Sequence, residues 1–325
     1  MTKENDSYSP WPHRLAWALC CTTLPLILLG SMVTNYGAGM AVEDWPTTFG
    51  YWFYPIQAWL AVWDLFLEHG HRMLAQAVGL LAIGLAVVLW WKDSRRWTRL
   101  LGLAVVVGVI SQGILGGVRV IFDDVMLAKI HGCTAPLFFA LCTAVVTMTS
   151  RKWLSDTPPR EHPAAGRMQR MAVVLAVAFY LELVIGAQLR HQLSGDWAGD
   201  AWAGWFELWV WLKLIGAGLL TGGVVWLLRF VSRNLPDEPA IVFRARLLAG
   251  LFLTQAVLGA AAWVTKYGWP GWFSDYIMAI DYTVVAEGPL QTTVRTAHVG
   301  VGACSLAAAL SLALWSRRLL RRTAP

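Results

Sequence analysis

Eight long apolar stretches constrain this chain of 325 residues more than any other feature of its sequence. They lie at about residues 15–36, 69–91, 98–119, 126–149, 168–190, 205–230, 243–265 and 291–316. About 20 helical residues cross the roughly 30 Å hydrocarbon layer of a bilayer. Only helices and closed barrels satisfy their backbone polar groups in lipid, and continuous rather than alternating apolar residues favour helices. The sequence therefore predicts an all-α integral membrane protein with eight transmembrane helices.

The basic residues indicate how these helices are oriented. The segments before the first stretch and after the second, fourth, sixth and eighth hold 19 of the 26 Lys and Arg residues. The other side holds the remaining 7, together with 13 of the 20 acidic residues. Because basic loops stay in the cytoplasm, we expect an inner (cytoplasmic) membrane protein with both termini cytoplasmic. The net charge of +6 is therefore explained by orientation, and no nucleic-acid partner is expected.

Similar segments recur in the two halves of the chain. The pair Gly186 and Gly195 repeats the spacing of Gly30 and Gly39, and Gln255–Ala260 resembles Gln112–Gly117. These matches occur in the same order, which is typical of an internal duplication. We predict two tandem pseudo-symmetric four-helix bundles: an N-terminal half at 1–150, a cytoplasmic linker at 151–170 and a C-terminal half at 171–325.

Three histidines and one lysine occupy matching positions near one end of the even-numbered stretches. They are His71, His131, Lys213 and His298, and the residues four positions later are all small: Ala75, Ala135, Ala217 and Gly302. Residues at i and i+4 lie on one helix face, so each side chain has flat space beside it, as a porphyrin edge would need. Haem iron takes histidine as an axial ligand. We predict that His71, His131 and His298 are haem-iron ligands; a hydrogen-bonded structural histidine at the membrane interface is the alternative.

A polar cluster surrounds the first of these histidines. On a helix, Glu68 shares a face with His71, and Arg72 lies one turn from Glu68. His69 points about 200° away from His71. Ionisable side chains at the edge of the hydrocarbon layer suggest a functional site, although a polar helix end in the headgroup layer is the alternative. His13, His69 and His162 lack the matching context, and we expect them to be solvated.

Cationic residues near the same ends are candidates to meet carboxylates, because Arg binds carboxylates in bidentate fashion. They are Arg119, Arg190, His191 and Arg295. The five cysteines, by contrast, all lie inside apolar stretches without metal-site spacing, and we expect them to be structural.

Several of these motifs resemble the haem A synthase family of the CtaA type. They are Asn35–Met40, Asp44-Trp45-Pro46, Glu68-x-x-His71-Arg72 and Gly186-x-x-x-Arg190-His191, and the resemblance covers about residues 15–316. It implies oxidation of a ring methyl of haem O to a formyl group, giving haem A for terminal oxidase assembly. It also implies that one half holds the substrate haem and the other a haem b.

The resemblance assigns roles to the predicted site residues. His71 and His131 would bind the iron of haem O in the N-terminal half, with Glu68 catalytic beside the reacting methyl. His298 would bind haem b, whose second ligand is expected where this chain has Lys213. That haem is then five-coordinate, ligated by lysine, or lost. Arg72, Arg190 and His191 would contact the haem groups. The cysteine pair of many relatives is absent from residues 37–67.

Two other functional classes use the same features. A non-enzymatic membrane b-type cytochrome would keep the histidines but give Glu68 no chemical role, and a transporter would explain the duplication alone. The expected partners are haem O, membrane lipid and an electron donor that the sequence does not identify. The resemblance adds haem O synthase, terminal oxidase assembly factors and a second copy of the chain as candidates.

Overall fold

A computed structural model describes residues 9–323 except 53, 191–199 and 279–282. Among these residues, eight helices are long and apolar enough to cross a membrane, so the predicted all-α membrane fold is confirmed. The long helices are α1 (Trp11–Asn35), α3 (Trp63–Lys92), α4 (Arg96–Ile121), α5 (Val125–Met148), α6 (Ala165–Arg190), α7 (Asp200–Asn234), α8 (Pro239–Tyr267) and α10 (Pro289–Leu319).

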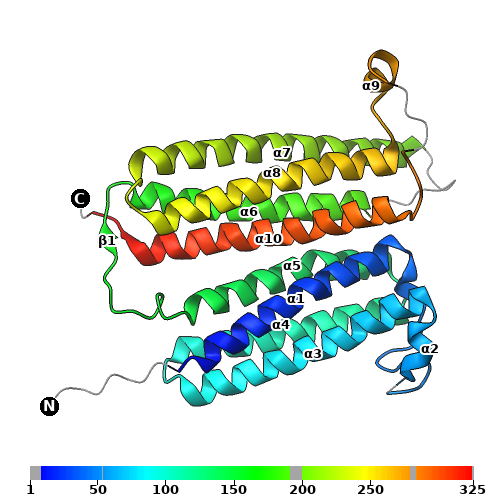
Figure 1. The fold of residues 1–325 in the computed structure, drawn as a ribbon, viewed down its shortest axis with the longest axis horizontal. Coiled ribbons are helices and arrows are strands. Elements are labelled where there is room, and N and C mark those ends of the chain that lie inside the picture. The colour runs from blue at the N-terminus through cyan, green and yellow to red at the C-terminus, as the bar shows by residue number, and fades with distance from the viewer. Residues whose placement is uncertain (1–8, 53, 191–199, 279–282, 324–325) are drawn as a thin grey trace.

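The helices form two groups that lie side by side (Figure 1). Helix α3 packs against α1 and α4, and α5 also packs against both of them. In the second group α10 packs against α8 and α6, while α7 lies between α6 and α8. Helix α1 begins and α10 ends at the same end of the molecule (Figure 1), which we call the termini end; the other is the far end. The two groups correspond to the two halves of the chain, whose pseudo-symmetric duplication stays a prediction.

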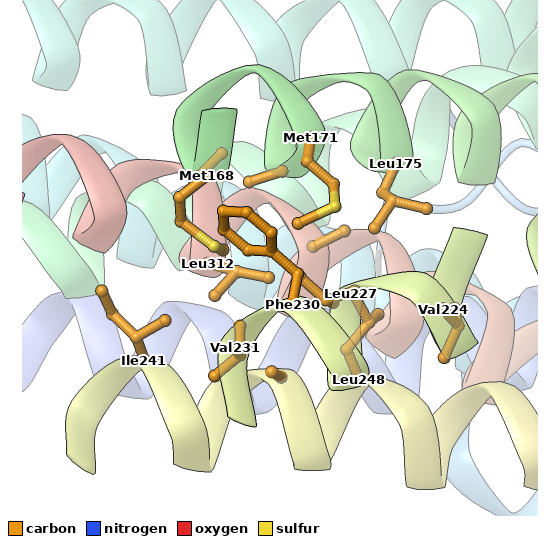
Figure 2. Close-up of a cluster of buried hydrophobic side chains, with 14 of the residues drawn as sticks. Met168, Met171, Leu175, Val224, Leu227, Phe230, Val231, Ile241, Leu248 and Leu312 are labelled. Atoms are coloured by element: carbon orange, nitrogen blue, oxygen red, sulfur yellow. The ribbon is translucent and has the colours of Figure 1, made fainter. Parts of the chain in front are cut away.

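Each group has its own apolar core. In the C-terminal group, Met168 and Met171 of α6 lie around Phe230 of α7, with Leu248 of α8 and Leu312 of α10 nearby (Figure 2). The core of the N-terminal group draws on α1, α3, α4 and α5, and two small residues of α10 join it. These buried clusters fix the positions of the helices, while many apolar side chains on the outer faces remain exposed, as a lipid-facing surface requires.

The seam between the groups is made mainly by α1, α5 and α10, and α6 also contacts α5. A Cβ atom added at Gly300 of α10 would lie 2.5 Å from Cδ2 of Leu28 on α1, so these two helices touch closely. Near the far end, the Asn35 side chain donates a hydrogen bond of 3.0 Å to Thr296 Oγ1. The two halves are therefore joined by both apolar and polar contacts.

Short elements connect the long helices. At the far end are η1 (Ala38–Met40), α2 (Ile56–Leu60) and α9 (Gly271–Tyr276), and at the termini end β1 (Arg160–Glu161) pairs in parallel with β2 (Leu320–Arg321). The sequence placed the start of the second span near residue 69. In the structure α3 begins at Trp63, and Phe66 and Leu67 of its first turns pack with the end of α1 and with Ala38.

Candidate functional site

His71 of α3 packs directly on Gly30 of α1. A Cβ atom added at Gly30 would lie 2.8 Å from Cε1 of the His71 ring, which is closer than real side chains approach. The backbone of Leu26, one turn earlier on α1, is within reach of the ring. Across the described residues, however, nothing forms a well-aligned hydrogen bond with the buried Nδ1 atom. Since buried polar atoms are normally paired, this histidine has unused bonding capacity.

His131 of α5 lies in the same way on Gly116 of α4. A Cβ atom added at Gly116 would lie 3.3 Å from Cε1 of the ring, and the backbone of Gln112, one turn earlier, is again within reach. The buried Nδ1 atom has no hydrogen-bond partner within the described part of the chain. His71 and His131 are close enough to interact electrostatically. The structure therefore brings these two predicted site residues together inside the N-terminal half.

His298 of α10 repeats this arrangement in the C-terminal half. A Cβ atom added at Gly259 of α8 would lie 3.1 Å from Cε1 of His298. The Gln255 side chain, one turn before that glycine, places its Nε2 atom 3.3 Å from Nε2 of the ring. As far as the chain is described, Nδ1 of His298 is buried without a partner. His298 also lies within electrostatic range of Lys213, the residue facing it on α7.

Lys213 completes the set of four matching positions. A Cβ atom added at Gly186 of α6 would lie 3.4 Å from the Lys213 Nζ atom. That Nζ donates a hydrogen bond of 2.9 Å to the backbone oxygen of Glu182 and forms a salt bridge of 2.5 Å with its Oε2 atom. Each of the four side chains therefore lies on a glycine of the preceding long helix and beside the residue one turn before it. Lys213 alone has an acidic partner there.

Glu68 and Arg72 connect α3 to the loop that follows α1. The two side chains form a salt bridge of 2.7 Å, and Glu68 is almost completely buried, with 3% of its side chain exposed. Its other oxygen accepts a hydrogen bond of 3.0 Å from the Val42 backbone N–H. Arg72 also donates to the backbone oxygens of Val42, Asp44 and Thr47. Glu68 therefore fixes the loop while lying one turn from His71.

The loop itself closes over the far end of the N-terminal half. Trp45 of the Asp44-Trp45-Pro46 motif packs on Gly117, where a Cβ atom would collide with the indole ring. The guanidinium of Arg119 packs on Gly39, within 2.8 Å of an added Cβ atom. Arg119 is also in electrostatic range of Glu68. Two consecutive glycines of α4 thus allow two close contacts: Gly116 with the candidate ligand His131, and Gly117 with Trp45 of the covering loop.

Three cations gather at the far end of the C-terminal half. Arg190 donates hydrogen bonds of 2.8 Å to the Ser31 backbone oxygen and 3.1 Å to Asn35 Oδ1, which ties α6 to α1. Arg295 and Lys266 lie in electrostatic range of Arg190 and of each other. No acidic side chain in the described residues forms a salt bridge with any of them. His191, predicted to act beside Arg190, lies outside the described residues.

His69 corrects one of the expectations from the sequence. It is not solvated: only 5% of it is exposed, and its Nδ1 atom lies 2.9 Å from the Thr48 hydroxyl. The ring also contacts Trp59, with ring centroids 5.2 Å apart. The loop and α2 fold over this face of α3 and cover the histidine. Glu182 is a residue to which the sequence assigned no role, because its partner lies 31 positions away on another helix.

The sequence also matches a known family. The match is to COX15-CtaA, described as cytochrome oxidase assembly protein, and it covers residues 13–274. The chain belongs to this family. The matched part of the COX15-CtaA protein takes in His71, His131 and Lys213, while His298 lies beyond it.

Several curated relatives are similar to parts of this chain, from about a quarter to about three quarters of its length. A haem A synthase from Shouchella clausii is 26% identical over 268 residues, which is 74% of this chain and 83% of that protein. A haem A synthase from Methylobacterium radiotolerans is 30% identical over 202 residues, 59% of this chain and 51% of that protein. A protohaem IX farnesyltransferase from Halobacterium salinarum is 35% identical over 74 residues, 23% of this chain and 16% of that protein.

Proposed function

We propose that this protein is a haem A synthase, a membrane oxidoreductase that converts a ring methyl of haem O to a formyl group. The family match and the similarity to haem A synthases over most of the chain support the reaction class. The observation that carries the proposal is the pair His71 and His131. Each ring lies on a glycine of a neighbouring helix, Gly30 of α1 or Gly116 of α4, and has a buried Nδ1 atom without a well-aligned partner in the described residues. The two rings lie in electrostatic range of each other.

The N-terminal half is the proposed site for the haem O substrate. Two imidazoles from opposite helices can bind the iron from both sides, as histidines do in b-type haem proteins. Facing helices of a four-helix bundle commonly hold a cofactor in this way. Gly30 and Gly116 would fix the plane of each ring, because any larger residue would push the imidazole out of place. This division assigns substrate binding to residues 1–150.

Glu68 is the proposed catalytic residue beside the reacting methyl. It lies on the face of α3 that carries His71, and its buried carboxylate is held by Arg72 and the Val42 N–H. These bonds fix a negative charge near the ring edge, where it can stabilise positive charge that develops during oxidation and accept a proton. Arg72 would set the charge and orientation of Glu68, and Arg119 lies near both histidines.

The cation cluster of Arg190, Arg295 and Lys266 is a proposed binding site for haem carboxylates. Three positive charges without an acidic partner in the described part of the chain favour an anion, and Arg binds carboxylates through paired hydrogen bonds. The haem b implied for this half fits its residues only in part. His298 has the same glycine support as His71, but Lys213 is bonded to Glu182.

The proposed orientation places the termini end in the cytoplasm and the haem sites near the outer surface of the inner membrane. The basic residues after α3, α5, α7 and α10 support it through the positive-inside rule. We further propose that haem O reaches the protein from a haem O synthase, a prenyl-transferring enzyme of the class represented by the farnesyltransferase relative. The product would pass to terminal oxidase assembly.

Pigment analysis tests the proposed function directly. The chain is expressed in a host that supplies haem O, and the extracted haems are separated by chromatography and identified by mass. We expect formyl-bearing haem A with the wild type and none with His71→Ala. His13→Ala is the matched control, because His13 lies at the termini end and bonds to Thr149, and it should leave haem A formation unchanged. If the wild type yields only unmodified haem, the chain is an electron-carrying cytochrome instead.

A further inference from the structure

The C-terminal half differs from the N-terminal half at one point of an otherwise shared geometry. Gly30, Gly116, Gly186 and Gly259 each support a side chain from the next long helix of their half. Three of these side chains are histidines with an unpaired buried Nδ1. At the fourth, Lys213 is bound by Glu182.

The lysine is one of three differences that occur together. The residue one turn before the supporting glycine is Leu26, Gln112 or Gln255 elsewhere, but it is Glu182 on α6. The residue three positions after the supported side chain is Leu74, Thr134 or Val301 elsewhere, but it is Gly216 on α7. A Cβ atom at Gly216 would overlap the Oε1 atom of Glu182. The glycine therefore makes the room that the carboxylate occupies.

The contacts of the lysine amine identify its partner. Lys213 Nζ points to two acceptors of one residue, the Oε2 atom and the backbone oxygen of Glu182. Glu182 is largely buried, with 10% of its side chain exposed, whereas 26% of the Lys213 side chain is exposed. An amine that binds iron must present a free electron pair to the metal. Both acceptors of Glu182 engage the Lys213 amine, so it is not available to iron while this pair is in place.

We propose that Glu182, Lys213 and Gly216 form a built ion-pair site between α6 and α7 that takes the place of one haem ligand. Among the described residues, His298 is then the only ligand-type side chain facing the centre of the C-terminal half, so this half holds no six-coordinate haem. The inference rests on the proposed haem chemistry of the family. It can be tested independently of that chemistry, because the coordination of a bound haem is read without any turnover.

The decisive experiment restores the arrangement found at the other positions. Glu182→Gln with Lys213→His gives α6 the glutamine of Gln112 and Gln255, and gives α7 the histidine of the other even spans. The wild type and the double variant are purified with haem supplied during expression. Low-spin haem is measured by electron paramagnetic resonance, and total haem per chain is measured by pyridine haemochrome. We expect the low-spin haem per chain to rise about twofold in the double variant, because iron with two axial imidazoles is low-spin.

Three further variants assign the signal to its site and test the ion pair itself. Adding His298→Ala to the double variant should remove the gained signal, and adding His71→Ala should remove the other one. Glu182→Leu with Lys213→Met removes the ion pair without leaving a buried charge, and it should leave the wild-type haem signal unchanged. His71→Ala is also introduced alone and together with Glu182→Leu and Lys213→Met. The proposal is wrong if a low-spin signal remains in His71→Ala alone but is lost when Glu182→Leu and Lys213→Met are added, since Lys213 would then be a ligand. It is also wrong if the double variant folds, as judged by size-exclusion chromatography, but gains no low-spin haem.

The pigment assay separates this outcome from the proposed function. A chain that makes haem A and shows the gain in low-spin haem supports both proposals. A chain that makes no haem A but shows the gain supports the ion-pair site alone.

Discussion

The two halves of this protein support a side chain on a glycine at matching positions, but the pair of side chains differs between the halves. In the N-terminal half, His71 and His131 lie on Gly30 and Gly116 and face each other. In the C-terminal half, His298 faces Lys213, which is bound by Glu182. The supporting glycines are present in all four places, so the helix packing is independent of the ligand type. A histidine at this position can therefore be exchanged for a lysine while the close helix contact stays.

The acidic residue of each half makes the contrast sharper. Glu68 pairs with Arg72 on its own helix and accepts from the loop backbone, so it joins the helix to the covering loop. Glu182 pairs with a lysine on the next helix, so it joins two spans. The first acid lies one turn from the ligand-type His71, whereas the second bonds to Lys213, which stands where a ligand-type histidine stands on the other even-numbered spans. We therefore expect the first to control chemistry and the second to control stability.

The largest stability effect should come from breaking the Glu182–Lys213 pair on one side only. Lys213→Met leaves a buried carboxylate without its cation, which costs about 3–5 kcal/mol in the free energy of unfolding. Lys213→Met combined with Glu182→Leu removes both charges and should recover most of that loss. Denaturant unfolding in detergent micelles measures both variants. Equal loss in the single and the double variant would show that packing, rather than the unpaired charge, sets the cost.

Glu68→Ala should have the next largest effect, this time on the reaction. We expect haem A formation to fall on the order of 100-fold, as for loss of a proton-transfer group, while haem O still binds through His71 and His131. Pigment extraction and a haem titration on the same preparation separate the two quantities. Glu68→Gln is the matched control for the loop, because its amide oxygen can still accept from Val42. Full activity in both Glu68→Ala and Glu68→Gln would show that Glu68 has no catalytic role and only holds the loop.

Replacing the supporting glycines tests whether the two halves hold their side chains equally tightly. Gly30→Ala meets a rigid ring at 2.8 Å, so it should destabilise the fold by about 1–3 kcal/mol and weaken haem binding. Gly186→Ala meets the flexible end of Lys213 at 3.4 Å and should be close to neutral. Gly218→Ala on α7, with no atom within 4 Å in the described residues, is the control. Unfolding and haem titration give the comparison, and equal effects at residues 30 and 186 would contradict it.

The smallest effect concerns the loop that covers the N-terminal half. Burial alone would raise the pKa of Asp44, but hydrogen bonds from the Thr47 hydroxyl and the Gly50 and Phe49 N–H groups outweigh it and lower that pKa. Because its pKa is lowered in the folded state, the Asp44 carboxylate contributes its full stabilisation of the loop above the ordinary Asp range. This stabilisation is lost as the pH falls through the lowered pKa. The protection of the Phe49 and Gly50 N–H groups against hydrogen exchange, relative to an unstructured chain at the same pH, should fall at acid pH. Asp44→Asn should show this lower protection already at neutral pH. Equal protection in the wild type and Asp44→Asn at neutral pH would show that the Asp44 carboxylate does not hold the loop.

The sequence predicted the spans and the matching positions because both depend on local pattern. Long apolar runs predict the helices, and recurring residues near the span ends gave His71, His131, Lys213 and His298. The glycine beside each side chain depends on the register between two helices, which no single segment contains. For the same reason the sequence left Glu182 without a role. His69 was wrongly expected to be solvated, because the fold of the loop over α3 brings Thr48 and Trp59 to it.

The most direct test of the difference between the halves compares His131→Ala with His298→Ala. Both remove one imidazole from α5 or α10 at positions with the same glycine support. Each variant is purified with bound haem and its low-spin signal is recorded by electron paramagnetic resonance beside the wild type. The account predicts that the signal is lost in His131→Ala and kept in His298→Ala. A low-spin signal that survives in His131→Ala and disappears in His298→Ala would contradict it.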